Sequence, residues 1–177
     1  MGVETERKWL LDKLPENADK FPHTEIVQGY LCADPVIRVR RDGDKYYLTY
    51  KGRGRLSREE YNLPLNEEAF LKLCGKCDGV LIEKTRYRIP IGENGVIPAD
   101  VTDEIKSEMH AGSGINLTAE IDVFKGKYSG LIYAEVEFPD EMSAESFQAP
   151  VWFEEEVTYK SGYSNAELAL GMHGGGF

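Results

Sequence analysis

The first strand-like segment of the chain carries three ionisable side chains on one face. If residues 3–10 form a β-strand, side chains alternate between two faces, so Glu4, Glu6 and Lys8 point the same way. Neighbouring carboxylates suit Mg²⁺ or Mn²⁺, which prefer oxygen ligands, and a lysine suits a phosphate group. This face could therefore hold a divalent metal ion and a phosphorylated ligand side by side.

The same alternation recurs in later segments, where the sign of the charge is sorted by segment. The basic pairs are Arg38/Arg40 and Lys84/Arg86, and the acidic pairs are Glu120/Asp122 and Glu135/Glu137. Like charges two residues apart on a strand lie about 6–7 Å from each other and repel, more strongly when shielded from water. For any one segment, the solvated outer face of a β-sandwich is the simpler interpretation, but surfaces that favour solubility mix both signs. The sorted signs instead favour one shared interior.

Strand-like patterns dominate the chain. The predicted strands are residues 3–11, 25–31, 36–41, 45–52, 57–65, 80–91, 116–124, 131–138 and 154–160. An Asp-Gly pair predicts a tight hairpin between the third and fourth of these. The predicted helices are residues 66–77, capped by Asn66, and residues 143–149 and 164–172, each opened by a serine. A weaker helical pattern lies at residues 103–109.

These elements predict an α+β fold that is mainly β. The strands are too many and too closely spaced for β-α-β units, which favours an antiparallel sheet. A closed β-barrel with a polar lumen would place the basic and acidic faces around one cavity, with helices packed outside against the apolar faces. A metal-bound polyphosphate would satisfy both sets of charges in that cavity, because Mg²⁺ is commonly shared between carboxylates and phosphates.

Composition narrows the possible partners. The chain has 177 residues and a net charge of −10, which suits one domain and disfavours a broad nucleic-acid surface. We expect no membrane partner, because no apolar run is long enough to span a bilayer. With three cysteines and no recognisable secretion signal, we expect a cytoplasmic protein. Cys74 and Cys77 form a lone CxxC, which is weak support for metal or redox chemistry. The sequence does not decide whether the protein is a monomer or a homodimer.

The ordered motifs of the chain resemble those of the CYTH superfamily, the triphosphate tunnel metalloenzymes. The resemblance begins with the ExExK signature at residues 4–8. It continues with IVQGYL, VIRVRR, YYLTYKG, IEKTRYRIP, AEIDVF, AEVEF, APVWFEEEVT and YSNAELA. It implies a single tunnel domain over residues 1–172, built as a closed barrel of eight antiparallel strands. Compared with compact members, residues 92–118 look like an insertion, and residues 173–177 look like a frayed tail.

The resemblance also implies roles for the charged residues. It implies metal ligands at Glu4, Glu6, Glu120, Asp122, Glu135 and Glu137. It implies phosphate-binding residues at Lys8, Arg38, Arg40, Lys51, Arg58, Lys84, Arg86 and Lys160. The expected catalytic residues are Glu4, Glu6, Lys8, Glu60 and Lys160. Of these, Glu60 either binds a second metal or orients water, and Lys160 contacts phosphate or assists the leaving group.

These roles predict a Mg²⁺- or Mn²⁺-dependent hydrolase that cleaves the terminal phosphate of a small triphosphate. Inorganic tripolyphosphate is the favoured substrate, because hydrolysis needs only the phosphates and water. A class IV adenylate cyclase and a thiamine or nucleoside triphosphatase are the alternatives. A non-catalytic polyphosphate-binding module is a further alternative, although binding alone would need only the cations and not the acidic set.

Overall fold

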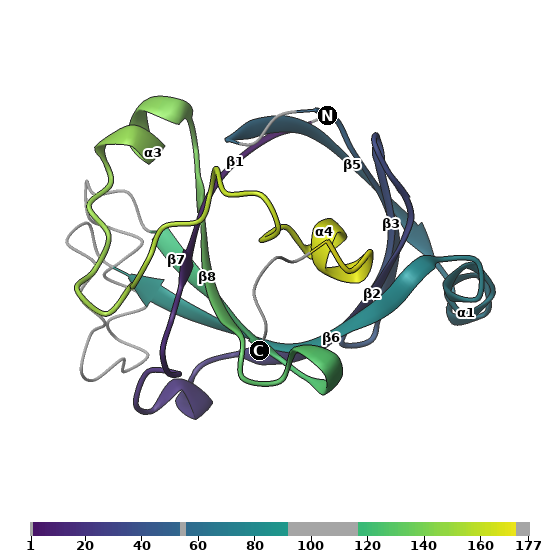
Figure 1. Ribbon diagram of the computed structural model, residues 1–177, viewed down its shortest axis with the longest axis horizontal. Helices are drawn as coiled ribbons and strands as arrows, with labels where there is room; N and C mark the ends of the chain where they lie inside the picture. Colours follow the sequence, from purple (N-terminus) through teal and green to yellow (C-terminus); the bar gives the residue numbers. More distant parts are fainter. Residues whose placement is uncertain (1, 54–55, 92–116, 173–177) are drawn as a thin grey trace.

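Among the described residues, eight antiparallel strands make up most of the fold, which confirms the prediction of a mainly β protein. The computed structural model describes residues 2–53, 56–91 and 117–172. The hydrogen-bonded order is β1-β5-β4-β3-β2-β6-β7-β8, and β8 pairs back with β1, so the order closes into the ring of Figure 1. The strands are β1 (Gly2–Leu10), β2 (His23–Ala33), β3 (Val36–Asp42), β4 (Lys45–Lys51), β5 (Ser57–Leu65), β6 (Asp78–Ile91), β7 (Leu117–Phe124) and β8 (Ile132–Phe138).

Short helices join the strands, and most begin at a side-chain cap. They are α1 (Glu67–Cys74), α3 (Glu141–Ser146) and α4 (Asn165–Ala169), with 3-10 turns at Ala18–Lys20 and Gly126–Tyr128. The predicted Asn66 cap is confirmed, since its side chain accepts from the Ala69 amide. The predicted start of α3 was late, because Asp140 caps the helix by accepting from the Ser143 amide.

The predicted division of each strand into two faces is confirmed by the register. Lys8 lies directly opposite Glu135, and Arg86 lies directly opposite Asp122. Directly opposed residues in an antiparallel pair share a face of the sheet. All four residues are at most 8% exposed, so these charged faces are buried inside the ring and not solvated on its outside.

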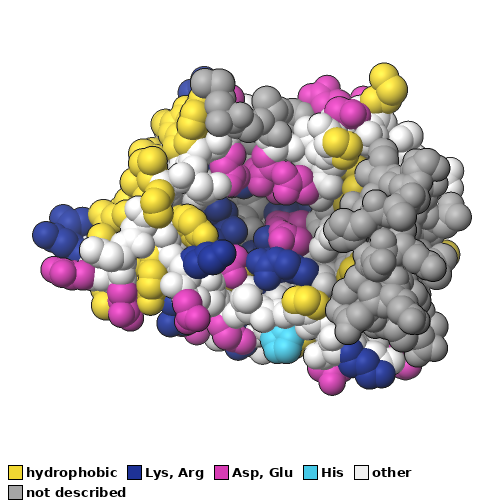
Figure 2. All heavy atoms as spheres, turned by 180° about the vertical axis from the view of Figure 1, so that it is seen from behind, with side chains coloured by type: hydrophobic (Ala, Val, Ile, Leu, Met, Phe, Trp, Pro, Cys, Tyr) yellow, Lys and Arg dark blue, Asp and Glu magenta, His cyan; other side chains and the backbone are white. Residues whose placement is uncertain are grey.

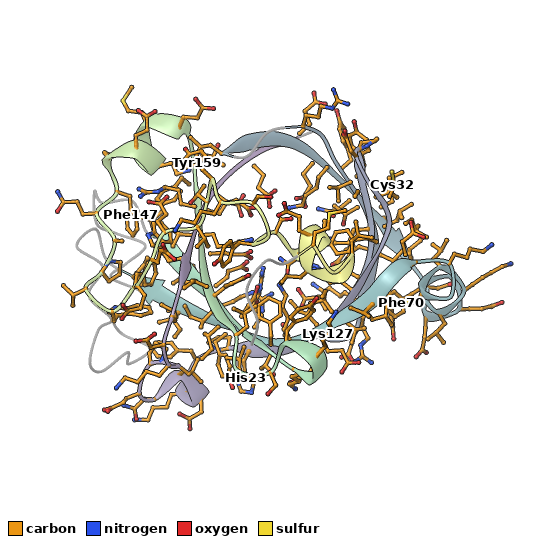
Figure 3. The ribbon with its side chains drawn as sticks, in the orientation of Figure 1. His23, Cys32, Phe70, Lys127, Phe147 and Tyr159 are labelled. Carbon is orange, nitrogen blue, oxygen red and sulfur yellow. The ribbon has the colours of Figure 1, made fainter. Side chains whose placement is uncertain are left out.

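The main apolar core lies on the outer face of β1, β6, β7 and β8. Its strand residues include Trp9, Ile121 and Val136, and the segment after α3 covers them. The Trp9 ring packs edge-on against Phe147, with centroids 5.8 Å apart. In Figure 3, Phe147 lies outside the ring beside α3, and Phe70 of α1 lies outside its opposite edge. Of the helices, α3 covers this apolar face, whereas α1 packs against β2, β3 and β4. Both helices lie outside the ring, as predicted.

The prediction that all helices pack outside is wrong for α4, which lies within the ring (Figure 1). Leu168 and Ala169 of α4 pack against inward-facing Tyr30, Phe124 and Tyr133. The interior of the ring is apolar where these three aromatic residues lie, so the apolar side chains of α4 are buried there. Ser164 caps α4 in a reciprocal capping box with Glu167, which confirms the predicted serine cap, although the helix ends at Ala169 and not near residue 172.

The predicted strand at residues 154–160 is also wrong. This segment makes one isolated bridge, between Trp9 and Glu156, and backbone hydrogen bonds from Leu10 to Glu155 and from Val157 to Lys8. It borders the second half of β1, where pairing with β5 has ended at Thr5. Its alternating charges imitate a strand, although it forms too few ladder bonds to be one.

The remaining predictions concern the hairpin between β3 and β4 and the segments at residues 92–118 and 173–177. The predicted hairpin is confirmed, because only Gly43 and Asp44 separate β3 from β4 and Gly43 has a positive φ of 57°. The helix predicted at residues 103–109, most of the proposed insertion at 92–118, and the tail at 173–177 lie outside the described residues. None of the described helices has the length and apolar character needed to cross a membrane.

Candidate active site

Charged side chains line a cavity of about 350 Å³ inside the ring. Figure 2 shows Asp or Glu and Lys or Arg side chains gathered around a hollow near the centre of one face of the molecule. The predicted site residues that line this cavity are Glu4, Glu6, Lys8, Arg38, Arg40, Lys51, Glu60, Arg86, Glu120, Glu135, Glu137 and Lys160. These predicted residues come from every strand except β2 and from the segment that follows α3, and β2 adds Ala33 to the lining.

One wall of the cavity concentrates carboxylates. Glu6 of β1 lies directly opposite Glu137 of β8, and Glu120 lines the same cavity from β7. Burial raises the pKa of Glu137, and the neighbouring charges of Glu120, Glu6 and Glu60 raise it further. Carboxylates that disfavour one another's ionisation in this way gain from a bound cation.

The deepest acidic residue of the predicted set, Asp122, is instead enclosed by cations. It is fully buried, as is Lys84, and the Lys84 ammonium contacts its Oδ2. Arg86 donates its Nε to Oδ1 at 2.7 Å and a terminal nitrogen to Oδ2 at 2.6 Å. Burial opposes ionisation of Asp122, but Arg86 and Lys84 hold its pKa below the usual value. Neither Asp122 nor Lys84 lines the cavity.

Two further cations are held by carboxylates at the cavity wall. The Lys8 ammonium lies 2.9 Å from Glu135, whose pKa stays well below the usual value because Lys8 and Arg86 outweigh the effect of burial. The Lys51 ammonium contacts Glu4 at 2.5 Å and Glu60 at 2.7 Å. Burial opposes ionisation of Glu60, yet Lys51 and the Asn62 amide lower its pKa to about 2. Glu60 is therefore ionised at neutral pH.

Arg38 and Arg40 differ from the other cations of the site. In the described part of the chain, neither guanidinium has a carboxylate within ion-pairing distance. Arg38 reaches Thr49 at 3.4 Å, and its buried Nε has no hydrogen-bond partner among the described atoms. Burial lowers the pKa of Arg40 to about 10, and the charges of Arg38 and Arg86 add to this effect. Together the two side chains present uncompensated positive charge to the cavity.

Lys160 and Arg58 complete the predicted set. Lys160 lines the cavity but is 46% exposed, and its ammonium contacts Glu155. Arg58 lies on β5 opposite Glu4, and its side chain is outside the part of the chain that the structure describes.

Sequence reasoning missed two neutral residues that contact the site. The Lys84 ammonium also reaches the Asn165 side chain of α4 at 3.3 Å. The Gln28 side chain accepts from the Nε of Arg40 at 3.1 Å and is fully buried. A buried amide on the inward face of a strand needs hydrogen-bond partners. Gln28 could therefore have been expected to contact a polar residue of a neighbouring strand.

The carboxylate wall has the chemistry of a Mg²⁺ or Mn²⁺ site, although its side chains are not gathered into one. Among the described residues, no three His, Cys, Asp or Glu side chains are placed to hold a metal ion together. Oxygen donors of this kind nevertheless suit hard divalent cations, and burial together with the charges of Glu120 and Glu6 raises the pKa of Glu137 at this point. Burial also raises the pKa of Cys77 to about 11, which argues against a reactive thiolate in the CxxC segment.

A ring of antiparallel strands with sorted charges around one cavity defines the class of protein. The chain belongs to the CYTH domain family, which matches residues 3–169. It is 34% identical to an inorganic triphosphatase of Nitrosomonas europaea over 96% of this chain and 99% of the relative. It is 33% identical to an inorganic triphosphatase of Acetivibrio thermocellus over 95% and 94% of the two chains. The crystal structure of the inorganic triphosphatase NE1496 superimposes with a TM-score of 0.62 at 32% identity, covering 98% of this chain and 99% of that one.

Proposed function

We propose that this protein hydrolyses the terminal phosphate of a small triphosphate, with inorganic tripolyphosphate as the favoured substrate and Mg²⁺ or Mn²⁺ as the metal. The uncompensated charge of Arg38 and Arg40 is the observation that carries the proposal, because it calls for a polyanion. The names of two full-length relatives, both inorganic triphosphatases, support the same reaction.

The side chains divide the tasks of the reaction between two walls. Arg38, Arg40 and Arg86 bind and orient the phosphate chain, since a planar guanidinium can contact phosphate oxygens through two bonds. Asp122 and Glu135 set the positions of the buried cations, a role that differs from the metal ligation expected for them. Glu60 is ionised, so it can accept a hydrogen bond from a water that lies in line with the terminal phosphorus.

The carboxylate wall would hold the metal. Glu4, Glu6, Glu120 and Glu137 are the residues that line the cavity with suitable oxygens. When bound, a divalent metal ion would neutralise charge that develops on the phosphate oxygens. Water adds to the terminal phosphorus as the bond to the bridging oxygen breaks, and orthophosphate, pyrophosphate and a proton are released.

Product analysis with three substrates tests the proposal. The purified protein is incubated with tripolyphosphate, ATP or thiamine triphosphate, each with Mg²⁺ or Mn²⁺. We expect orthophosphate release to be fastest from tripolyphosphate and to fall by orders of magnitude in Glu6→Gln, which keeps the size of the side chain. Cyclic AMP and pyrophosphate from ATP would instead indicate a cyclase, and no turnover of any substrate would indicate a binding module.

A further inference from the structure

A buried chain of three side chains ends at one of the two unpaired arginines. Gln28 and Tyr30 lie on the inward face of β2, and Gln28 is directly opposite Arg40 of β3. The Gln28 amide nitrogen donates to the Tyr30 hydroxyl at 2.9 Å, and its oxygen accepts from the Arg40 Nε at 3.1 Å. Gln28 is fully buried and Tyr30 is 3% exposed, so water does not compete for these bonds.

The order of the chain fixes the direction of each group. Because the Arg40 guanidinium can only donate, the amide oxygen of Gln28 must face Arg40, and the amide nitrogen is then left to donate to the Tyr30 hydroxyl. The amide oxygen occupies the Nε of Arg40, which leaves the two terminal nitrogens of the guanidinium for other partners. Arg40 lines both the main cavity and an adjoining cavity of about 210 Å³, so those nitrogens have space to meet a ligand.

The neutrality of Gln28 distinguishes it from the groups that hold the neighbouring arginine. Arg86 is positioned by Asp122, Glu120 and Glu135, whose negative charges also compensate its positive charge. An amide orients a guanidinium with a comparable hydrogen bond but leaves its full charge available.

We infer that Gln28, held in turn by Tyr30, is a positioning residue that orients Arg40 toward the phosphate chain without neutralising it. The inference rests on the proposed function in that it takes a phosphate chain as the ligand. Gln28 thus contributes to substrate affinity although it lies behind the wall of the cavity and does not line it.

Binding without turnover is the direct test. Tripolyphosphate is titrated calorimetrically into the protein in EDTA, so that affinity is measured apart from hydrolysis. Gln28→Met is close in shape but cannot accept the Nε hydrogen bond, and we expect it to weaken binding about tenfold, the size of one hydrogen bond to a charged group. Tyr30→Phe should weaken binding in the same direction by less, and it guards against a poorly folded Gln28→Met.

Two controls separate positioning from a general structural effect. Thr24→Val alters the same face of β2 at a residue that contacts Asp42 and Arg88, and it should leave affinity within about twofold of wild type. In an Arg40→Ala background, Gln28→Met should likewise change affinity by less than about twofold, because its effect passes through Arg40.

The outcomes distinguish this inference from the proposed function. Wild-type affinity in both Gln28→Met and Tyr30→Phe, or a loss of the same size with and without Arg40, would overturn the role of Gln28. A wild-type protein that binds tripolyphosphate but hydrolyses no triphosphate would overturn the proposed reaction and leave the binding role of Gln28 supported by its own measurement.

Discussion

At the scale of single residues, the charges of the bore fall into two groups. Asp122 and Glu135 compensate buried cations, whereas Arg38 and Arg40 have no carboxylate within ion-pairing distance among the described residues. A buried charge that has no oppositely charged partner is strongly destabilising, because the protein interior solvates it poorly. The protein accepts that cost at the two arginines, and a bound polyanion would relieve it.

An ion pair outside the bore offers a test of how charge contributes to stability. Arg7 binds both oxygens of Glu156 and also donates to the carbonyl oxygens of Ala144 and Phe147. The hydrogen bond from Arg7 lowers the pKa of Glu156 below its usual value, although partial burial acts against it. A depressed pKa in the folded state contributes stability above the unfolded pKa, and the contribution is lost as pH falls through the folded value.

We therefore expect Glu156→Gln to lower the free energy of unfolding by about 1–3 kcal/mol at neutral pH. The difference from wild type should shrink when the pH is well below the ordinary glutamate pKa of about 4.3. Urea unfolding at the two pH values measures it, with Glu154→Gln at an exposed neighbouring position as the control. A deficit that stays the same at both pH values would point to packing and not to charge.

At the scale of elements, local patterns predicted most of the sheet. Local patterns identified every strand of the ring, and alternation identified the inward face of the strands that carry charged pairs, because inside and outside differ there in charge and apolarity. No inward face was predicted for β2. The same pattern failed at residues 154–160, since whether a charged, alternating segment joins a ladder depends on the partner beside it. The position of α4 also escaped prediction, because a short apolar helix surface does not say which apolar surface will cover it.

The pairing of charges could not be predicted for a related reason. Alternation placed Lys84, Arg86 and Asp122 on inward faces, but only the register of β6 against β7 brings Arg86 opposite Asp122. A shift of the pairing by two residues would preserve every inward face and change every ion pair. Sequence therefore predicted the members of the candidate site and left open which carboxylates are available to a metal.

Close contact between α4 and β6 can be tested at a glycine. Gly79 of β6 has a φ of 69°, and a Cβ built on it would lie 2.0 Å from the Ala169 carbonyl oxygen. Gly126 has a similar φ of 59°, but a Cβ there would meet nothing within 4 Å. Both positions carry the cost of about 1–2 kcal/mol that a left-handed conformation imposes on alanine.

We expect Gly79→Ala to lower the free energy of unfolding by more than Gly126→Ala, because it must also displace α4 from the end of the bore. Urea unfolding of the two variants measures the difference, and the conformational cost of alanine largely cancels between them. Equal losses in the two variants would show that α4 does not depend on the close approach at Gly79.

At the scale of the whole molecule, the barrel separates an apolar end from a charged interior. Inward-facing Tyr30, Phe124 and Tyr133 pack with α4 at the apolar end, and the cavity lies among the charged residues. The chain has a net charge of −10, yet it keeps two uncompensated arginines inside. Stability and anion binding therefore make opposite demands on the same residues, as is common at functional sites.

Arg38→Met tests this opposition, because methionine preserves apolar bulk and removes the charge. Arg38 is 5% exposed and its Nε has no partner among the described atoms, so we expect the ligand-free variant to be at least as stable as wild type. Tripolyphosphate at a hundredfold excess over its dissociation constant should add about 2.7 kcal/mol to the wild-type free energy of unfolding. The same concentration should add much less in the variant.

Urea unfolding in EDTA with and without tripolyphosphate measures both effects, with the exposed Arg53→Met as the control. A variant that loses stability without ligand and gains as much as wild type with it would show that Arg38 supports the fold and not the anion.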